Sequence, residues 1–297
     1  MFWKVKALAR DLVTKPVVAS SAARLRVERG SLAPLTSPEK MAIVAAWSQF
    51  PTQSLSLSSY LQELHEAGFW PLVVSTADFA EPLQWPHGIP APAVVLRREN
   101  SGYDFGSWAA VLHALPQIRQ ADTVLLTNDS LVGPFWSLQP IFQDLAQSCA
   151  DVVGLTDSTQ LDHTLQSYFL AFKHGVLSEP PWRRFFANIR PQATKMEVVY
   201  RYEAAIVAKC RREGYAWEAQ YPAQALRAGK TNPSLTWWRE LLQTGMPFVK
   251  RTLFTEVKLA AEGEAARRFL AEEYGIAIEE WLPVGKPKEQ QTATLAK

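Results

Sequence analysis

The sequence is poor in cysteine, has no long apolar run and carries almost no net charge. Cys149 and Cys210 are the only two cysteines among 297 residues, and neither belongs to a Cys-x-x-Cys or Cys/His spacing. We therefore expect two reduced thiols in a reducing compartment, not a disulfide framework or a zinc site. No stretch approaches the roughly 20 apolar residues of a membrane-spanning helix, and no signal-peptide pattern follows Met1. The protein is thus predicted to be cytoplasmic, and a net charge of +2 predicts no nucleic-acid partner.

Glycine-rich phosphate-binding motifs are also missing. Neither a GxGxxG sequence nor a P-loop follows any apolar run, which argues against a Rossmann-type dinucleotide site. Tryptophan, in contrast, is abundant, with eleven residues. Tryptophan faces are suited to contacts with sugar rings, but most of these side chains could equally pack in the core.

Short apolar runs alternate with segments of helical periodicity along the chain. The periodic segments, predicted to be helices, lie at residues 57–64, 108–115 and 138–145. The apolar runs have the length and turn boundaries of buried strands, and they cover residues 41–47, 70–74, 93–96, 123–126 and 151–155. A further strand is expected within 167–172 and a loop over 216–232, whereas 196–200 could be a short strand or the start of a helix. The pattern predicts an α/β fold with a mostly parallel open sheet flanked by helices.

Segments of different composition flank this central part. Residues 1–40 contain eight basic and three acidic side chains, and Phe2, Trp3 and Leu8 lie on one side of a predicted helix. This helix could rest on the anionic surface of the inner membrane, or it could be a solvated helix docked on the core. We therefore predict a basic helical extension over 1–40, a catalytic domain over 41–256, and an acidic helical segment with a disordered tail over 257–297.

Polar residues follow two of the predicted strands. Asn128, Asp129 and Ser130 follow the strand at 123–126, and the strand at 93–96 is followed by Arg97, Asn100, Gly102 and Asp104. The helix predicted between these strands makes a strand–helix–strand crossover, so we expect the two strands to be parallel neighbours. Both polar groups would then lie at the same edge of the sheet, where open α/β sheets bind ligands. We therefore predict that they form one crevice.

The same stretch carries a resemblance to a known family. The sequences of residues 98–108 and 128–134 resemble those of the rhamnan synthesis protein F family of bacterial polysaccharide glycosyltransferases. Further similar pieces occur at 151–158, 163–169, 202–203, 214–215 and 247–250, and the resemblance covers roughly residues 40–255. It implies a GT-A-like fold that transfers a sugar such as rhamnose from a nucleoside diphosphate sugar to a growing polysaccharide or a lipid-linked glycan. Such an acceptor would place the protein at the inner membrane.

The resemblance also implies roles for individual residues. The Asp-x-Asp motif that binds Mg²⁺ or Mn²⁺ in GT-A enzymes is replaced here by the single carboxylate of Asp129, to which His163 could add a second ligand. Alternatively, Arg97, Arg98 or Lys195 could supply the positive charge directly. Donor-binding residues are expected to be Arg97, Asn100, Gly102, Asp104, Asn128, Ser130, His163 and Gln166.

Glu203 is the favoured catalytic base, and Asp157 and Asp104 are its competitors, although Asp104 is better suited to fix the donor sugar or the turn. Glu203 comes before a helix that ends in Gly214 and Tyr215, similar to the segment that carries the base in inverting GT-A enzymes. It could instead be the buried partner of an arginine. Two other functions stay open, a sugar-binding module without catalysis and a sugar-phosphate transferase.

Overall fold

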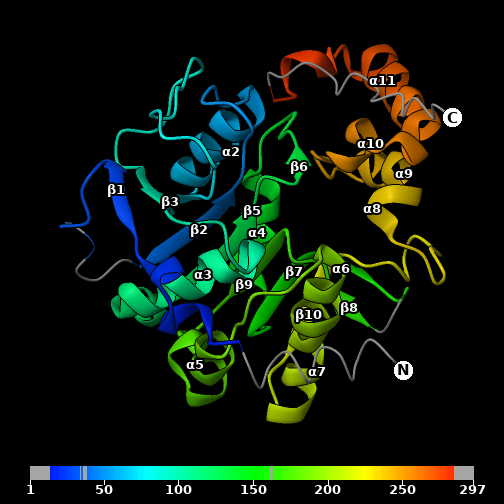
Figure 1. Cartoon of the computed structure of the whole chain (residues 1–297). Helices are drawn as coiled ribbons and strands as arrows, with labels where there is room; N and C mark the ends of the chain where they lie inside the picture. The colour runs from blue at the N-terminus through cyan, green and yellow to red at the C-terminus, as the bar shows by residue number, and fades with distance from the viewer. Residues whose placement is uncertain (1–13, 34, 36–38, 161–162, 284–297) are drawn as a thin grey trace, which may run out of the picture.

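A mixed sheet of nine strands forms the centre of the protein. Figure 1 shows the computed structural model, with the strands in the middle and helices around them. The structure describes residues 14–33, 35, 39–160 and 163–283. Along the sheet the strands follow the order β1-β4-β3-β2-β5-β9-β7-β10, and β8 pairs with β7. The bounds are β1 (Arg26–Arg29), β2 (Lys40–Ala46), β3 (Trp70–Ser75), β4 (Val94–Arg97), β5 (Thr123–Asn128), β7 (Val152–Ser158), β8 (Thr164–Leu165), β9 (Phe169–Phe172) and β10 (Trp217–Tyr221).

Most strands of this sheet run in one direction. Strands β4, β3, β2 and β5 are joined by parallel pairs, and β7 and β10 form another parallel pair. Strand β9 lies antiparallel between β5 and β7, and β1 pairs antiparallel with β4 at the other edge. The predicted α/β fold with a mostly parallel open sheet is therefore confirmed. The prediction that β4 and β5 are neighbours is wrong, because β3 and β2 lie between them.

Helices cover both faces of the sheet because its strands are apolar on both sides. Along β2, Met41 and Ile43 belong to one core cluster, whereas Ala42 and Val44 belong to the other. The helices of the first face are α3 (Tyr103–Ala114), α5 (Pro180–Ala187), α6 (Lys195–Val198) and α7 (Ala204–Glu213). The second face is covered by α2 (Leu55–Glu66) and α4 (Gln139–Gln147).

Three segments differ from the prediction or complete it. In the described part of 1–40, short 3₁₀ turns at Val17–Ala19 and Ser21–Ala23 precede strand β1, where a helix was expected. The predicted apolar helix face at residues 2–12 lies outside the described residues. Strand β10 occupies only residues 217–221 of the predicted loop over 216–232, since its polar residues are tolerated at a sheet edge. Residues 196–200 belong to a continuous helical stretch, in which a π-helical turn (Val199–Glu203) joins α6 to α7.

A smaller helical layer follows β10. It contains α8 (Pro233–Thr236), α9 (Trp238–Gln243), α10 (Thr252–Thr255) and α11 (Ala260–Tyr274), which Figure 1 shows together in yellow to red. Trp238, Leu253 and Leu270 share its apolar core. Antiparallel pairing of β11 (Val249–Lys250) with β6 (Leu131–Val132) attaches this layer to the segment after β5. The predicted disordered tail falls mainly at 284–297, outside the described residues.

No helix in the described part of the chain has both the length and the hydropathy that crossing a bilayer requires.

Candidate functional site

The two polar turns predicted from the sequence meet. The Asn128 Nδ2 atom at the end of β5 donates a hydrogen bond of 2.8 Å to Asp104 Oδ2, in the first turn of α3. They meet although β4 and β5 are not neighbours, because α3 crosses the sheet. Trp108 of this helix donates to the Thr127 carbonyl oxygen of β5 at 3.2 Å. Gly102, with a φ of 81°, caps the start of α3 and turns the chain out of β4 toward β5.

Asp129 lies where the strand order reverses. From β2 the chain continues outward to β3 and β4, and it then returns to form β5 on the other side of β2. The Asp129 backbone NH donates to the Ala45 carbonyl oxygen, and its Oδ2 atom accepts from the Trp47 NH, both at 3.2 Å. Crevices at such reversals are the common ligand sites of open α/β sheets.

Arg251 reaches the same place from the far end of the chain. Its Nη1 and Nη2 atoms lie 3.0 and 3.4 Å from the two carboxylate oxygens of Asp129. Its backbone NH donates to the Ser130 carbonyl oxygen at 2.9 Å, which continues the β6–β11 pairing. Only 23% of the Arg251 side chain and 16% of the Asp129 side chain are exposed. We call Asp104, Asn128, Asp129, Lys250 and Arg251 the strand-end cluster.

Lys250 brings a second positive charge into this cluster. Its Nζ atom lies 4.3 Å from the centroid of the Tyr168 ring. Burial, together with the positive charges of Lys195 and Arg251, lowers the pKa of Lys250 to about 8. The carboxylates that oppose this shift belong to Glu203 and Asp104. Lys195 and Glu203 therefore border the strand-end cluster.

Asp104 is affected in the opposite direction. Burial, together with the nearby negative charge of Asp129, raises the pKa of its carboxyl group to about 6. Lys195, Arg251 and the hydrogen bond from Asn128 limit this shift. The cluster thus holds two carboxyl groups and at least two cations in a partly desolvated environment.

The donor set around Asp129 does not match the metal site expected from the sequence. Both carboxylate oxygens are occupied by the Arg251 guanidinium, and one also accepts from the Trp47 NH. His163, the suggested second ligand, is paired with the Asp157 carboxylate through its Nε2 atom instead. In the part of the chain that the structure describes, no three His, Cys, Asp or Glu side chains are grouped to hold a metal. These residues fit a carboxylate paired with a guanidinium better than a ligand of Mg²⁺ or Mn²⁺.

Glu203 lies in the π-helical turn before α7. Its Oε2 atom accepts a hydrogen bond of 2.9 Å from the Ser167 backbone NH, and only 8% of the residue is exposed. Burial raises the pKa of the Tyr168 hydroxyl, and the negative charges of Glu203 and Asp157 contribute to the increase. The carboxylate is thus held near Tyr168 and Lys250, with a backbone donor fixing one oxygen.

Asp157 and His163 form a second, separate pair. Asp157 Oδ2 lies 2.5 Å from His163 Nε2, and Asp157 Oδ1 accepts from the Ala223 backbone NH at 2.5 Å. The rings of His163 and Trp217 are nearly perpendicular, with 4.6 Å between their centroids. Asp157, His163 and Trp217 line an open cavity of about 890 Å³ together with Arg227 and Lys230. Asp157 therefore holds His163 and the 223–230 loop in place.

Several predicted donor-binding residues have other positions. Arg97 forms a buried ion pair of 3.1 Å with Glu28 and donates to backbone carbonyl oxygens of residues 77–81. Arg98 donates to Ser107 Oγ and to the carbonyl oxygens of Ala22 and Ser101. The N–H donors of both guanidinium groups are bonded to oxygen atoms of the protein itself, so these side chains stabilise loops.

The other predicted donor-binding residues are Asn100, Ser130 and Gln166. Asn100 is exposed, and Gln166 is buried with its backbone NH bonded to the Thr156 carbonyl oxygen. Ser130 adjoins the strand-end cluster, where its backbone NH donates to Asn128 Oδ1 at 3.0 Å.

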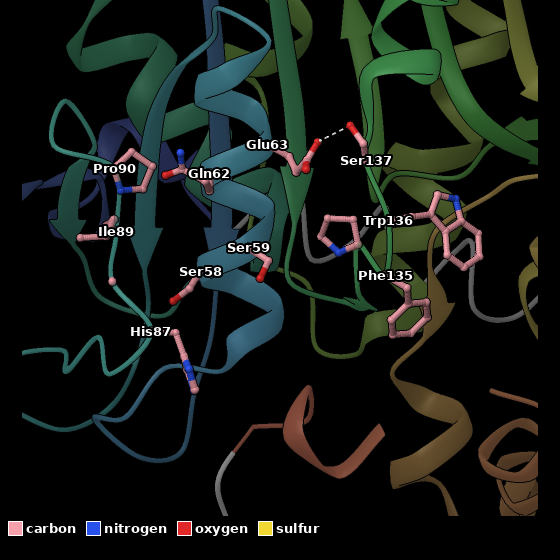
Figure 2. Close-up of a pocket in the computed structure, with 12 residues that line it drawn as sticks. Ser58, Ser59, Gln62, Glu63, His87, Ile89, Pro90, Phe135, Trp136 and Ser137 are labelled. Carbon is pink, nitrogen blue, oxygen red and sulfur yellow. Dashed lines mark hydrogen bonds between the residues drawn. The ribbon is translucent and has the colours of Figure 1, made fainter. Parts of the chain in front are cut away.

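A further hollow of about 580 Å³ crosses the outer face of α2. Figure 2 shows Ser58, Ser59 and Gln62 of α2 between His87, Ile89 and Pro90 on one side and Phe135 and Trp136 on the other. Glu63 is the carboxylate in its lining, and it accepts hydrogen bonds from the Ser137 hydroxyl and the Leu138 backbone NH. We assign no reacting group to this hollow.

Sequence reasoning overlooked Lys250 and Arg251 as site residues. They follow Asp129 by more than a hundred positions, and nothing in their spacing connects them to it. One available signal was a pair of adjacent cations directly after the apolar run 247–249, within a stretch that resembles the family.

Comparison with known proteins adds information on ancestry. The chain is 26% identical over 195 residues to "Virulence protein VirA" of Vibrio anguillarum, covering 55% of this chain and 62% of that protein. It is 25% identical over 143 residues to "Uncharacterized protein y4gN" of Sinorhizobium fredii, covering 46% of this chain and 37% of that protein. The match thus spans less than two-thirds of each relative. The family model of rhamnan synthesis protein F matches residues 92–273, which include the whole strand-end cluster. The chain therefore belongs to the rhamnan synthesis protein F family.

Proposed function

We propose that the protein is a glycosyltransferase that moves a sugar such as rhamnose from a nucleoside diphosphate sugar to a growing polysaccharide or lipid-linked glycan. The observation that carries this proposal is the hydrogen bond between Asp104 and Asn128, which joins two polar turns at the strand reversal between β2 and β5. A nucleotide sugar is a ligand class suited to such a crevice. Membership in a family named for rhamnan synthesis supports the same reaction class.

Glu203 is the proposed base of an inverting displacement. The acceptor hydroxyl oxygen forms a bond to the anomeric carbon of the donor while the bond from this carbon to the diphosphate oxygen breaks. The hydroxyl proton passes to the Glu203 carboxylate, and the electron pair of the broken bond leaves with the nucleoside diphosphate. The Ser167 NH fixes one Glu203 oxygen, so the other oxygen is the one assigned to the proton.

A panel of nucleotide sugars tests the donor. Since a ligand that binds only the folded state raises its melting temperature, the true donor should raise the melting temperature of the purified protein. Incubation with glycan and lipid-linked acceptors should then release a nucleoside diphosphate in proportion to the sugar transferred. Release of a nucleoside monophosphate would indicate a sugar-phosphate transferase instead.

The Glu203→Gln variant tests the base. We expect donor binding to be unchanged and transfer to fall by roughly 100-fold or more, because general base catalysis contributes about 10²–10⁴-fold. Glu213→Gln is the matched control, since Glu213 lies at the end of the adjoining helix α7, where it pairs with Arg212 at 3.0 Å. Full transfer activity in Glu203→Gln would reject this assignment.

A sugar-binding module without catalysis is the second candidate. It is favoured by the Asp129 carboxylate, which is paired with Arg251 and does not present an Asp-x-Asp metal site. Donor binding without any transfer or hydrolysis, across all acceptors and with Mg²⁺ or Mn²⁺ added, would support this candidate.

A further inference from the structure

We propose that Arg251 and Lys250 bind the diphosphate of the donor directly and take the place of a divalent metal ion. In this arrangement Asp129 is a positioning residue that holds the Arg251 guanidinium. The inference rests on the proposed function, because it assumes that the donor carries a diphosphate.

The geometry of the Asp129–Arg251 pair is the first argument. In a metal-dependent site the strand-end carboxylate would hold the cation that contacts the phosphates. Here the cation held by this carboxylate is a guanidinium, with contacts of 3.0 and 3.4 Å to its two oxygens. A guanidinium has five N–H donors in a plane, so it can bind Asp129 and a phosphate oxygen at the same time.

The position of Lys250 is the second argument. Lys250 is the last residue of β11 and directly precedes Arg251, and its Nζ atom lies over the Tyr168 ring in a partly buried environment. A lysine held there while charged has lost part of its hydration, and a bound anion would compensate for this loss. Lys195, exposed at the start of α6, adds a further positive charge at the border.

The carboxylates of the cluster do not prevent anion binding. The charge of Asp129 is neutralised by the ion pair with Arg251, and Asp104 accepts a hydrogen bond from Asn128. The raised pKa of Asp104, about 6, also reduces the negative charge that a diphosphate would meet below neutral pH. The remaining carboxylate at the border, Glu203, is the proposed base and faces the Ser167 NH.

Calorimetric titration of the full chain with UDP, dTDP, GDP and CDP tests the proposal. Each titration is done in EDTA and again with Mg²⁺ in excess over the protein and the nucleotide. We expect one of these diphosphates to bind with the same affinity in both buffers. The Arg251→Gln variant should bind it roughly 10- to 100-fold more weakly, since a hydrogen bond to a charged group is lost. Arg251→Lys should show an intermediate affinity because it keeps the charge but not the planar fork.

Two further variants separate binding from folding. Arg251→Gln leaves the Asp129 carboxylate unpaired, so its folding could be impaired. The double variant Asp129→Asn/Arg251→Gln keeps a neutral hydrogen-bonding pair, and we expect it to remain folded while losing diphosphate affinity. Lys258→Gln is the control for loss of one positive charge, since Lys258 is exposed on the turn after α10. It should bind like the unaltered protein.

The outcomes distinguish this inference from the proposed function. Diphosphate binding that disappears in EDTA, or that is unchanged in the folded double variant, overturns the role of Arg251 but leaves the glycosyltransferase proposal standing. If no diphosphate and no nucleotide sugar binds in either buffer, both proposals fail. Metal-independent binding that is lost in the double variant and kept in Lys258→Gln supports the inference.

Discussion

Replacing Lys250 with methionine should stabilise the fold while weakening diphosphate binding. Methionine matches the length of the lysine stem and removes the charged group from its partly buried position beside Tyr168. The same charge that makes Lys250 suitable for an anion is costly when no anion is bound. The substitution therefore separates the stability of the fold from its proposed function.

The pKa of Lys250 gives the magnitude. Burial lowers this pKa from 10.5 to about 8, against the partial opposition of Glu203 and Asp104. At 1.36 kcal/mol per pKa unit, the charged form is disfavoured in the folded state by about 3 kcal/mol. The cation–π contact with Tyr168, worth up to about 2 kcal/mol, is lost as well. We therefore expect the free energy of unfolding at pH 7 to rise by roughly 1–2 kcal/mol.

The dependence on pH identifies the cause. Below pH 8 Lys250 is protonated in both states, so the penalty is fully present. Between pH 8 and 10.5 the folded protein releases this proton before the unfolded chain does, and stability rises with pH. The advantage of Lys250→Met should therefore be largest near pH 7 and should shrink as pH rises above 8.

Urea unfolding of both proteins at pH 7, 8, 9 and 10 measures this difference. Comparing the two proteins at each pH cancels the groups that titrate equally in both. Lys258→Met, on an exposed residue, is the control and should change stability by less than about 0.5 kcal/mol. A Lys250→Met variant that is less stable than the unaltered protein at pH 7, or whose advantage does not vary with pH, would refute the reasoning.

Two other substitutions test the surrounding structure. Asp104→Asn removes a carboxyl group whose pKa is raised to about 6 in the folded protein. As the pH rises from about 4 to 6, the unfolded chain has already released this proton but the folded protein still holds it, so the unaltered protein loses stability and the variant should not. The free energy of unfolding should fall from pH 4.5 to pH 7 by roughly 3 kcal/mol at most more in the unaltered protein than in the variant, as measured by urea unfolding. Equal pH profiles of the two proteins would contradict this prediction. Arg97→Met leaves Glu28 buried and unpaired and should cost roughly 3–5 kcal/mol by the same measurement. The double variant Arg97→Met/Glu28→Gln should recover much of this loss, and no recovery would contradict the ion-pair explanation.

Strands with a continuous apolar pattern were predictable from the sequence. The runs that form β2, β3, β4, β5 and β7 are buried on both faces, so their composition alone identifies them. Strand β10 was missed because it is a polar edge strand, and β11 because two residues are too few to give a pattern. Burial on both faces is thus what made a strand visible in the sequence.

The order of the strands was less accessible. Chain order suggested that β4 and β5 are neighbours, but sequence periodicity contains no information on which strands pair. The contact between Asp104 and Asn128 was nevertheless predicted correctly. Helix α3 crosses over β3 and β2, and it brings the turn after β4 to the end of β5. The Asp129–Arg251 contact joins residues 122 positions apart and depends on tertiary folding alone.

The late position of β11 in the chain has a consequence for biosynthesis. Every strand of the main sheet and the Asn128–Asp129 turn are translated before Lys250 and Arg251 leave the ribosome. A nascent or truncated chain that ends before β11 can complete the main sheet, but it lacks both cations of the strand-end cluster. The two cations that we propose as the diphosphate ligands therefore join the strand-end cluster only when the segment around β11 docks against β6.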